Sequence, residues 1–127
     1  YSWFDYSDLA VDLQNDHVLV SVSVQNTSER DGEEVVQLYI RDRVARVTRP
    51  VKELKGFQKR PIRAGETVRV ELSLNADELG YIDGRGEFFL DQGVFDIFIG
   101  GSSQTSLHSE INLTADQISA LLQSRAA

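Results

Sequence analysis

Apolar residues occupy every second position in four stretches of the chain, and this alternation constrains the fold more than any other feature of the sequence. The stretches span residues 18–24, 36–40, 68–74 and 95–99. Successive side chains of a β-strand point to opposite faces of a sheet, so apolar residues with a period of two predict strands with one buried face. The clearest case is 18–24, where four valines alternate with leucine and two serines. The sequence therefore predicts a protein built mainly of β-strands.

Weaker strand patterns and turn residues fill the intervals between these stretches. The weaker patterns lie at 9–13, 51–57, 86–90 and 107–113, and one helical turn is expected at 75–79. The turn-forming sequences are Asn15-Asp16, Asn26 through Gly32, Ala64-Gly65, Asp83-Gly84, Gln92-Gly93 and Gly100-Gly101. About seven short strands separated by turns at this spacing indicate an all-β, antiparallel sandwich. A β-barrel is the main alternative.

The end of the chain departs from the alternation and predicts a helix. Thr114 and Gln117 have the spacing of a capping box, in which each side chain bonds to the backbone of the other residue. They precede an apolar stripe at helical spacing, formed by Ile118, Leu121 and Leu122. We therefore expect a helix over about 115–124, which covers either the sandwich or a neighbouring domain. The expected division is a β-sandwich over 1–113 and a helical tail over 114–127.

Charge is distributed unevenly along the chain. The 127 residues carry 13 basic and 20 acidic side chains, a net charge of −7, which argues against a nucleic-acid partner. Residues 41–63 hold nine of the basic residues and two acidic ones, a net charge of +7, so the remainder is at −14. This basic segment predicts either a solvated strand and loop or a docking surface for an acidic partner, such as another domain of the same polypeptide.

The chain shows no motif for catalysis, a cofactor or a metal. It has no cysteine, and His17 and His108 lack the spacing of metal ligands. Asp83, Glu87 and Asp91 lie close in sequence, but Asp83-Gly84 is typical of a hairpin turn and the spacing of a calcium loop is missing. No apolar run approaches the roughly 18 residues of a membrane span. We expect no catalytic residue, cofactor, metal or membrane contact.

Two further features bear on binding. Asn26 and Asn112 stand in Asn-x-Ser/Thr triplets, the pattern of N-glycosylation, but we interpret Asn26 as a residue that ends a strand. Carbohydrate-binding modules stack sugars on exposed aromatic rings. Most phenylalanines of this chain fall in strand patterns and are expected mainly in the core, namely Phe88, Phe89, Phe95 and Phe98.

Several stretches in the same order resemble the C-terminal fibronectin type III-like domain of family 3 glycoside hydrolases, the β-glucosidases and β-xylosidases. They lie at 1–7, 22–27, 32–39, 47–57, 64–66 and 92–103. The most specific is 47–57, which is similar to the family's Val-x-Arg-Pro-x-Lys-x-Leu-Lys-Gly-Phe. The resemblance implies an immunoglobulin-like, fibronectin type III-like β-sandwich.

The resemblance also implies an accessory role. In that family the nucleophile Asp lies in an N-terminal barrel and the acid/base Glu in an α/β domain, and this chain matches neither. We therefore expect a non-catalytic domain whose partners are the catalytic domains of the same polypeptide. Arg49, Lys52 and Lys55 are the candidate interdomain contacts, while Leu54 and Phe57 are expected to anchor their strand in the sandwich. The alternative is an independent carbohydrate-binding or protein-binding module.

Overall fold

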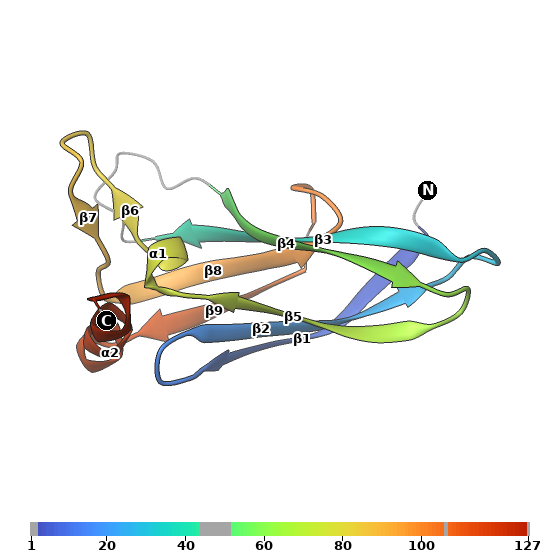
Figure 1. Ribbon diagram of the computed structural model, residues 1–127, viewed down its shortest axis with the longest axis horizontal. Helices are drawn as coiled ribbons and strands as arrows, with labels where there is room; N and C mark the ends of the chain where they lie inside the picture. Colours follow the sequence, from blue (N-terminus) through green and yellow to red (C-terminus); the bar gives the residue numbers. More distant parts are fainter. Residues whose placement is uncertain (1–2, 44–51, 106, 127) are drawn as a thin grey trace.

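The computed structural model describes residues 3–43, 52–105 and 107–126 as two antiparallel β-sheets packed face to face (Figure 1). The three-stranded sheet has the order β1-β2-β5 and is formed by β1 (Phe4–Leu13), β2 (Val18–Asn26) and β5 (Thr67–Leu74). The four-stranded sheet has the order β4-β3-β8-β9 and is formed by β3 (Gly32–Asp42), β4 (Glu53–Ile62), β8 (Gly93–Gly100) and β9 (His108–Leu113). The fold is therefore the predicted β-sandwich and not the alternative barrel.

The smaller elements gather at one end of the sandwich, at the left of Figure 1. They are the single-turn helix α1 (Ala76–Leu79), the short hairpin of β6 (Tyr81–Ile82) and β7 (Phe88–Phe89), and the C-terminal helix α2 (Ala115–Ala126). Arg125 of α2 ties this end together, because its Nε donates to Asp77 Oδ1 at 2.6 Å and its guanidinium lies 3.9 Å from the centre of the Phe88 ring. No helix among the described residues has the length and apolarity needed to cross a membrane.

The core lies between the two sheets and consists of the residues that alternate in the sequence. In the β2–β5 register Val22 lies opposite Val70, and in the β3–β8 register Leu38 lies opposite Ile99. All four are fully buried. The other fully buried apolar strand residues that share these faces are Val18, Val20, Val24, Val36, Leu74, Phe95 and Ile97. The four predicted strands, with their predicted buried faces, are confirmed.

Strand ends differ from prediction where the pattern is weak. β1 begins at Phe4 rather than near residue 9, and β7 has two residues rather than the predicted 86–90. β4 runs to Ile62 rather than ending near 57, although Pro61 cannot donate a backbone hydrogen bond. An edge strand tolerates proline because one of its sides has no neighbouring strand, and β4 is an edge strand.

The C-terminal helix is confirmed, and it covers this sandwich. The Thr114 backbone N–H donates to Gln117 Oε1 at 2.8 Å, and the Gln117 backbone N–H donates to Thr114 Oγ1 at 3.3 Å, so the capping box is complete. Leu121 is fully buried and Ile118 nearly so, both within the core cluster, while Leu122 remains partly exposed. The helix therefore extends the core at the end of the sandwich.

Asn26 is buried at the opposite end, where β2 stops. Its Nδ2 donates to the backbone oxygens of Arg30 at 2.8 Å and Ile62 at 2.9 Å. Its Oδ1 accepts from the Ser28 backbone N–H at 2.9 Å and from Ser28 Oγ at 2.7 Å. Asn26 thus joins the end of β2 to the following turn and to the end of β4, which confirms its interpretation as a strand-ending residue. Its side chain is 0% exposed, so the folded domain leaves no space for a glycan there.

Candidate interaction surface

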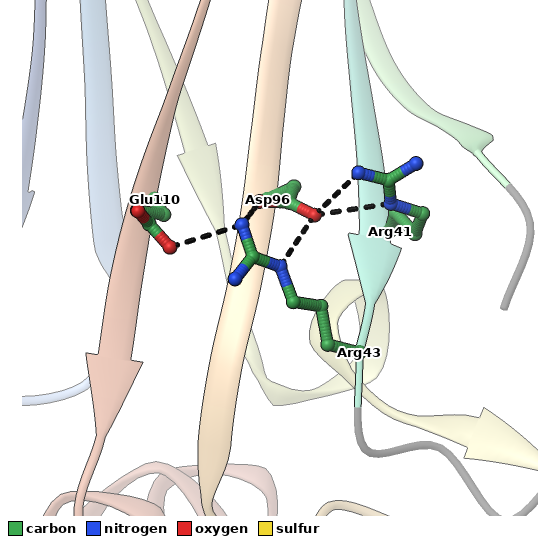
Figure 2. Close-up of polar contacts among 4 residues, drawn as sticks. All are labelled: Arg41, Arg43, Asp96 and Glu110. Atoms are coloured by element: carbon green, nitrogen blue, oxygen red, sulfur yellow. Dashed lines mark hydrogen bonds and ion pairs between the residues drawn. The ribbon is translucent and has the colours of Figure 1, made fainter.

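The outer face of the four-stranded sheet, which points away from the core, carries a cluster of paired charges. Arg41 lies opposite Asp96 in the β3–β8 register, and Arg43 follows Arg41 by two residues, so all three side chains share one face. Figure 2 shows both guanidinium groups turned toward the Asp96 carboxylate, with Glu110 of β9 approaching Arg43 from the other side. Three strands therefore contribute to a single ionic cluster.

The two arginines enclose the carboxylate. Arg41 donates to Asp96 Oδ2 through Nε at 3.0 Å and Nη2 at 2.8 Å. Arg43 donates to Oδ2 through Nε at 2.9 Å and to Oδ1 through Nη2 at 2.5 Å, and its Nη2 lies 3.0 Å from Glu110 Oε2. The Asp96 side chain is 0% exposed, whereas those of Arg41 and Arg43 are 43% and 45% exposed.

This geometry sets the charge state of Asp96. Hydrogen bonds from Arg43 are the main cause that lowers the pKa of the carboxyl, and those from Arg41 add to it. Burial acts in the opposite direction, because it disfavours the charged form. The net pKa lies below the usual value of 3.8, so Asp96 is an anion at neutral pH and holds both arginines over the sheet.

The expectation that Phe98 lies mainly in the core is wrong: Phe98 continues this outer face along β8, because its neighbours Ile97 and Ile99 point into the core. Phe98 stacks with the His108 ring of β9, with ring centroids 5.2 Å apart and planes at 21°. The Arg41 guanidinium lies 5.5 Å and the Lys52 ammonium 4.3 Å from the Phe98 centroid, distances at which a cation is attracted to a ring. Lys52 also donates to the backbone oxygen of Ser103 at 2.7 Å. The outer face thus combines aromatic rings with cations.

The predicted interdomain residues fall in different places. Arg49 lies outside the described residues. Lys52 lies on the outer face, and its ammonium is engaged by Phe98 and Ser103. Lys55 has a side chain that is only 22% exposed, with Nζ 3.9 Å from Glu53 Oε2. Their contacts with another domain stay predictions.

The expectation that Leu54 and Phe57 anchor β4 in the sandwich is wrong. Leu54 is 50% exposed and Phe57 is 67% exposed. The reason is a β-bulge: Lys55 is an extra residue in β4, opposite the step from Leu38 to Tyr39 in β3. The bulge turns Leu54 and Phe57 to the same outer face although they are three residues apart.

Asp83 has a structural role. Its Oδ1 accepts from the backbone N–H groups of Arg85 at 2.9 Å and Glu87 at 3.0 Å, which confirms the predicted hairpin turn. The bond from the Glu87 backbone is the largest of the effects that lower the pKa of Asp83. Among the described residues, no group of three His, Cys, Asp or Glu side chains is placed to hold a metal ion.

The ionic cluster is not predicted by the sequence. Arg41 and Asp96 alternate with buried residues of their strands, which is a signal that both face outward. That signal does not reveal which strands are neighbours or in what register, so it cannot pair the two residues.

Fold and surface together define an immunoglobulin-like β-sandwich domain with a cationic and aromatic outer face. A fibronectin type III-like domain model matches residues 34–103. The chain belongs to this fibronectin type III-like family, in the form that accompanies family 3 β-glucosidases and β-xylosidases.

Individual relatives agree with this assignment. The chain is 38% identical over 109 residues to the thermostable β-glucosidase B of Acetivibrio thermocellus, a match that covers 82% of this chain and 14% of the relative. It is 36% identical to a β-xylosidase of Formosa agariphila, with 90% and 16% covered. A solved β-glucosidase from Erythrobacter marinus superimposes with a TM-score of 0.80 at 40% identity, over 87% of this chain and 15% of that one. The chain therefore spans about one-seventh of the length of these relatives.

Proposed function

We propose that this chain is a non-catalytic accessory domain of a family 3 glycoside hydrolase of the β-glucosidase type, and that it packs on the catalytic domains and stabilises them. One observation carries the proposal: the sequence match to the β-glucosidase of Acetivibrio thermocellus covers 82% of this chain but only 14% of that enzyme. In such a relative, a domain of this kind is joined to a much longer polypeptide. The parent enzyme would hydrolyse terminal β-linked sugars.

The local chemistry is consistent with this role. Glycoside hydrolysis normally uses two carboxyl groups about 5–10 Å apart with a sugar between them. Asp96 is instead enclosed by two arginines, Asp83 closes a turn, and Glu34 accepts a hydrogen bond from the Tyr6 hydroxyl at 2.7 Å. These carboxylates have structural partners.

A domain exchange tests the proposal. The matching segment of the Acetivibrio thermocellus enzyme would be replaced by this chain, and the chimera compared with the intact enzyme and with an enzyme that lacks the segment. We expect the chimera to keep β-glucosidase activity and to resist heat inactivation better than the truncated enzyme. The isolated chain should not hydrolyse aryl β-glucosides or β-xylosides. Hydrolysis by the pure chain that one carboxylate substitution abolishes would refute the proposal.

Carbohydrate binding is the second candidate, because Phe57 is exposed on the outer face. A stacking platform needs adjacent rings that sugars can reach, whereas Lys52 lies 4.3 Å from the Phe98 centroid and 5.8 Å from that of Tyr39. We therefore rank this candidate second. Calorimetric titration of the chain with cello-oligosaccharides and xylan decides: saturable binding that Phe57→Ala removes would favour a carbohydrate-binding module.

A further inference from the structure

We propose that Val35, Leu54 and Phe57 form a docking patch, through which the domain binds an apolar surface with acidic surroundings on another domain of the same polypeptide. This inference rests on the proposed function and adds to it the face that makes the contact. We call these three side chains the outer patch.

The three side chains lie together on one face of the sheet. In the β3–β4 register Val35 is opposite Lys59, Gln37 is opposite Phe57, and Tyr39 is opposite Leu54. Directly opposed residues share a face, and so do residues two apart in a strand. The outer patch therefore follows the β3–β4 pair along its solvent side, at the sheet edge formed by β4.

The exposure of this patch is unusual for apolar residues on one pair of strands. Val35 is 38% exposed, Leu54 50% and Phe57 67%. The described part of the chain has five large apolar side chains that are exposed, and three of them are in the outer patch. Exposed apolar side chains gathered on one pair of strands mark an interaction site in soluble proteins more often than scattered ones do.

Cations beside the patch indicate the charge of the partner. Lys59 has a 63% exposed side chain and lies directly opposite Val35, with Nζ 3.6 Å from Glu33. Lys52 and Arg41 lie over the Phe98 ring further along the same face. Glu33 and Asp96 offset part of the charge of Lys59 and Arg41, whereas the Lys52 ammonium is held by a ring and a backbone oxygen and so adds positive charge to this face. A complementary surface is acidic around an apolar centre.

The same charges argue against two other occupants. A second copy of this chain would place like charges against one another across a two-fold axis, because such an interface joins the same patch on both subunits. A neutral sugar has no negative charge to pair with these cations, and Phe57 is the sole aromatic residue of the outer patch. The remaining candidate occupant is another domain of the same polypeptide. The relatives support it, since 86% of the length of the Acetivibrio thermocellus enzyme lies outside the matched segment.

The test uses the domain-exchange chimera with two substitutions in the outer patch, Leu54→Ser and Phe57→Ser. The matched control is Ile82→Ser, because Ile82 is 66% exposed on the β6–β7 hairpin. We expect the patch variant to lose activity on heating about tenfold faster than the unsubstituted chimera, as when side chains central to an interface are removed. The control should inactivate at the rate of the unsubstituted chimera. The isolated chain with the same two substitutions should keep its melting temperature, since both side chains are exposed.

A charge substitution gives a second readout that does not depend on apolar packing. Lys59→Glu should also accelerate inactivation of the chimera, more strongly at low salt, whereas Arg85→Glu on the hairpin, with a 74% exposed side chain, should not. If the patch and Lys59 variants inactivate at the unsubstituted rate, or if Ile82→Ser has the same effect as they do, the outer patch is not the docking site and the accessory role stands. If the unsubstituted chimera is as labile as the truncated enzyme, the accessory role itself fails.

Discussion

At the scale of single residues, two buried polar side chains hold this sandwich together at different places. Asn26 uses its amide for four hydrogen bonds at the end of β2, and Asp96 uses its carboxylate for four on the outer sheet face. A buried polar group is tolerated when its hydrogen bonds are satisfied, and removing one side of such a network leaves the other side unpaired. Both residues should therefore be sensitive to substitution.

Asn26→Ala should lower the free energy of unfolding by about 3 kcal/mol, because it strips partners from the buried backbone oxygen of Ile62 and from the following turn. Urea denaturation of the pure chain measures the change. Asn112→Ala is the matched control, since Asn112 is exposed on the edge strand β9 and its loss should shift the free energy of unfolding by less than about 0.5 kcal/mol. Equal effects of the two substitutions would contradict the structural role of Asn26.

Asp96 predicts how stability depends on pH. Its pKa is lower in the folded chain than the usual 3.8, mainly because of the hydrogen bonds from Arg43, so the folded state binds this proton less readily than the unfolded state. The stabilisation is therefore fully present above about pH 4 and is lost as pH falls through the lowered pKa. At pH 7, Asp96→Asn should cost roughly 3 kcal/mol of unfolding free energy.

Denaturation series at pH 7 and at about pH 2.5 test this expectation. The difference in unfolding free energy between the original chain and Asp96→Asn should shrink at the lower pH, because protonation removes the same charge that the substitution removes. A difference that stays constant between the two pH values would show that the ionic cluster is not the cause.

At the scale of elements, most strands could be predicted from the sequence. A strand with one buried face has apolar residues at every second position, and this alternation is visible in the sequence. β4 departs from this pattern inside the strand, because the inserted Lys55 shifts the phase and brings Leu54 to the outer face that Phe57 shares with Gln37. A bulge is a property of two paired strands, so the sequence of one strand does not reveal it. The ionic cluster could not be predicted for a related reason. Whether Arg41 lies opposite Asp96 depends on the register between β3 and β8, which neither strand's sequence reveals.

The C-terminal helix could be predicted because its first residues, Thr114 and Gln117, form a capping box that is visible in the local sequence. Thr114→Ala removes the side-chain oxygen that accepts from the Gln117 backbone, and should cost about 1 kcal/mol. Ser119→Ala, on the exposed surface of the same helix, is the control and should change stability little or slightly increase it. Chemical denaturation followed by far-ultraviolet circular dichroism reports both. A Thr114 variant as stable as the Ser119 variant would mean that the capping box contributes nothing.

At the scale of the whole molecule, α2 and the two sheets share one core. Leu121 of α2 is 0% exposed and belongs to the same cluster as Val18 of β2 and Leu113 of β9. A short helix has little stability of its own in water, so its order depends on this packing. The sandwich in turn loses the cover over one end of its core if the helix detaches, which couples the two parts.

This coupling predicts one cooperative unfolding transition for the entire chain. Leu121→Ala should lower the unfolding free energy by about 3 kcal/mol, because it removes buried methyl groups and leaves a cavity. Leu122→Ala, at a residue that is 36% exposed, should cost less than about 1 kcal/mol. Calorimetry and circular dichroism at a helix-sensitive wavelength should give coincident transitions in both variants. A separate early loss of helical signal, with the sheets still folded, would show instead that residues 114–127 form an independent tail.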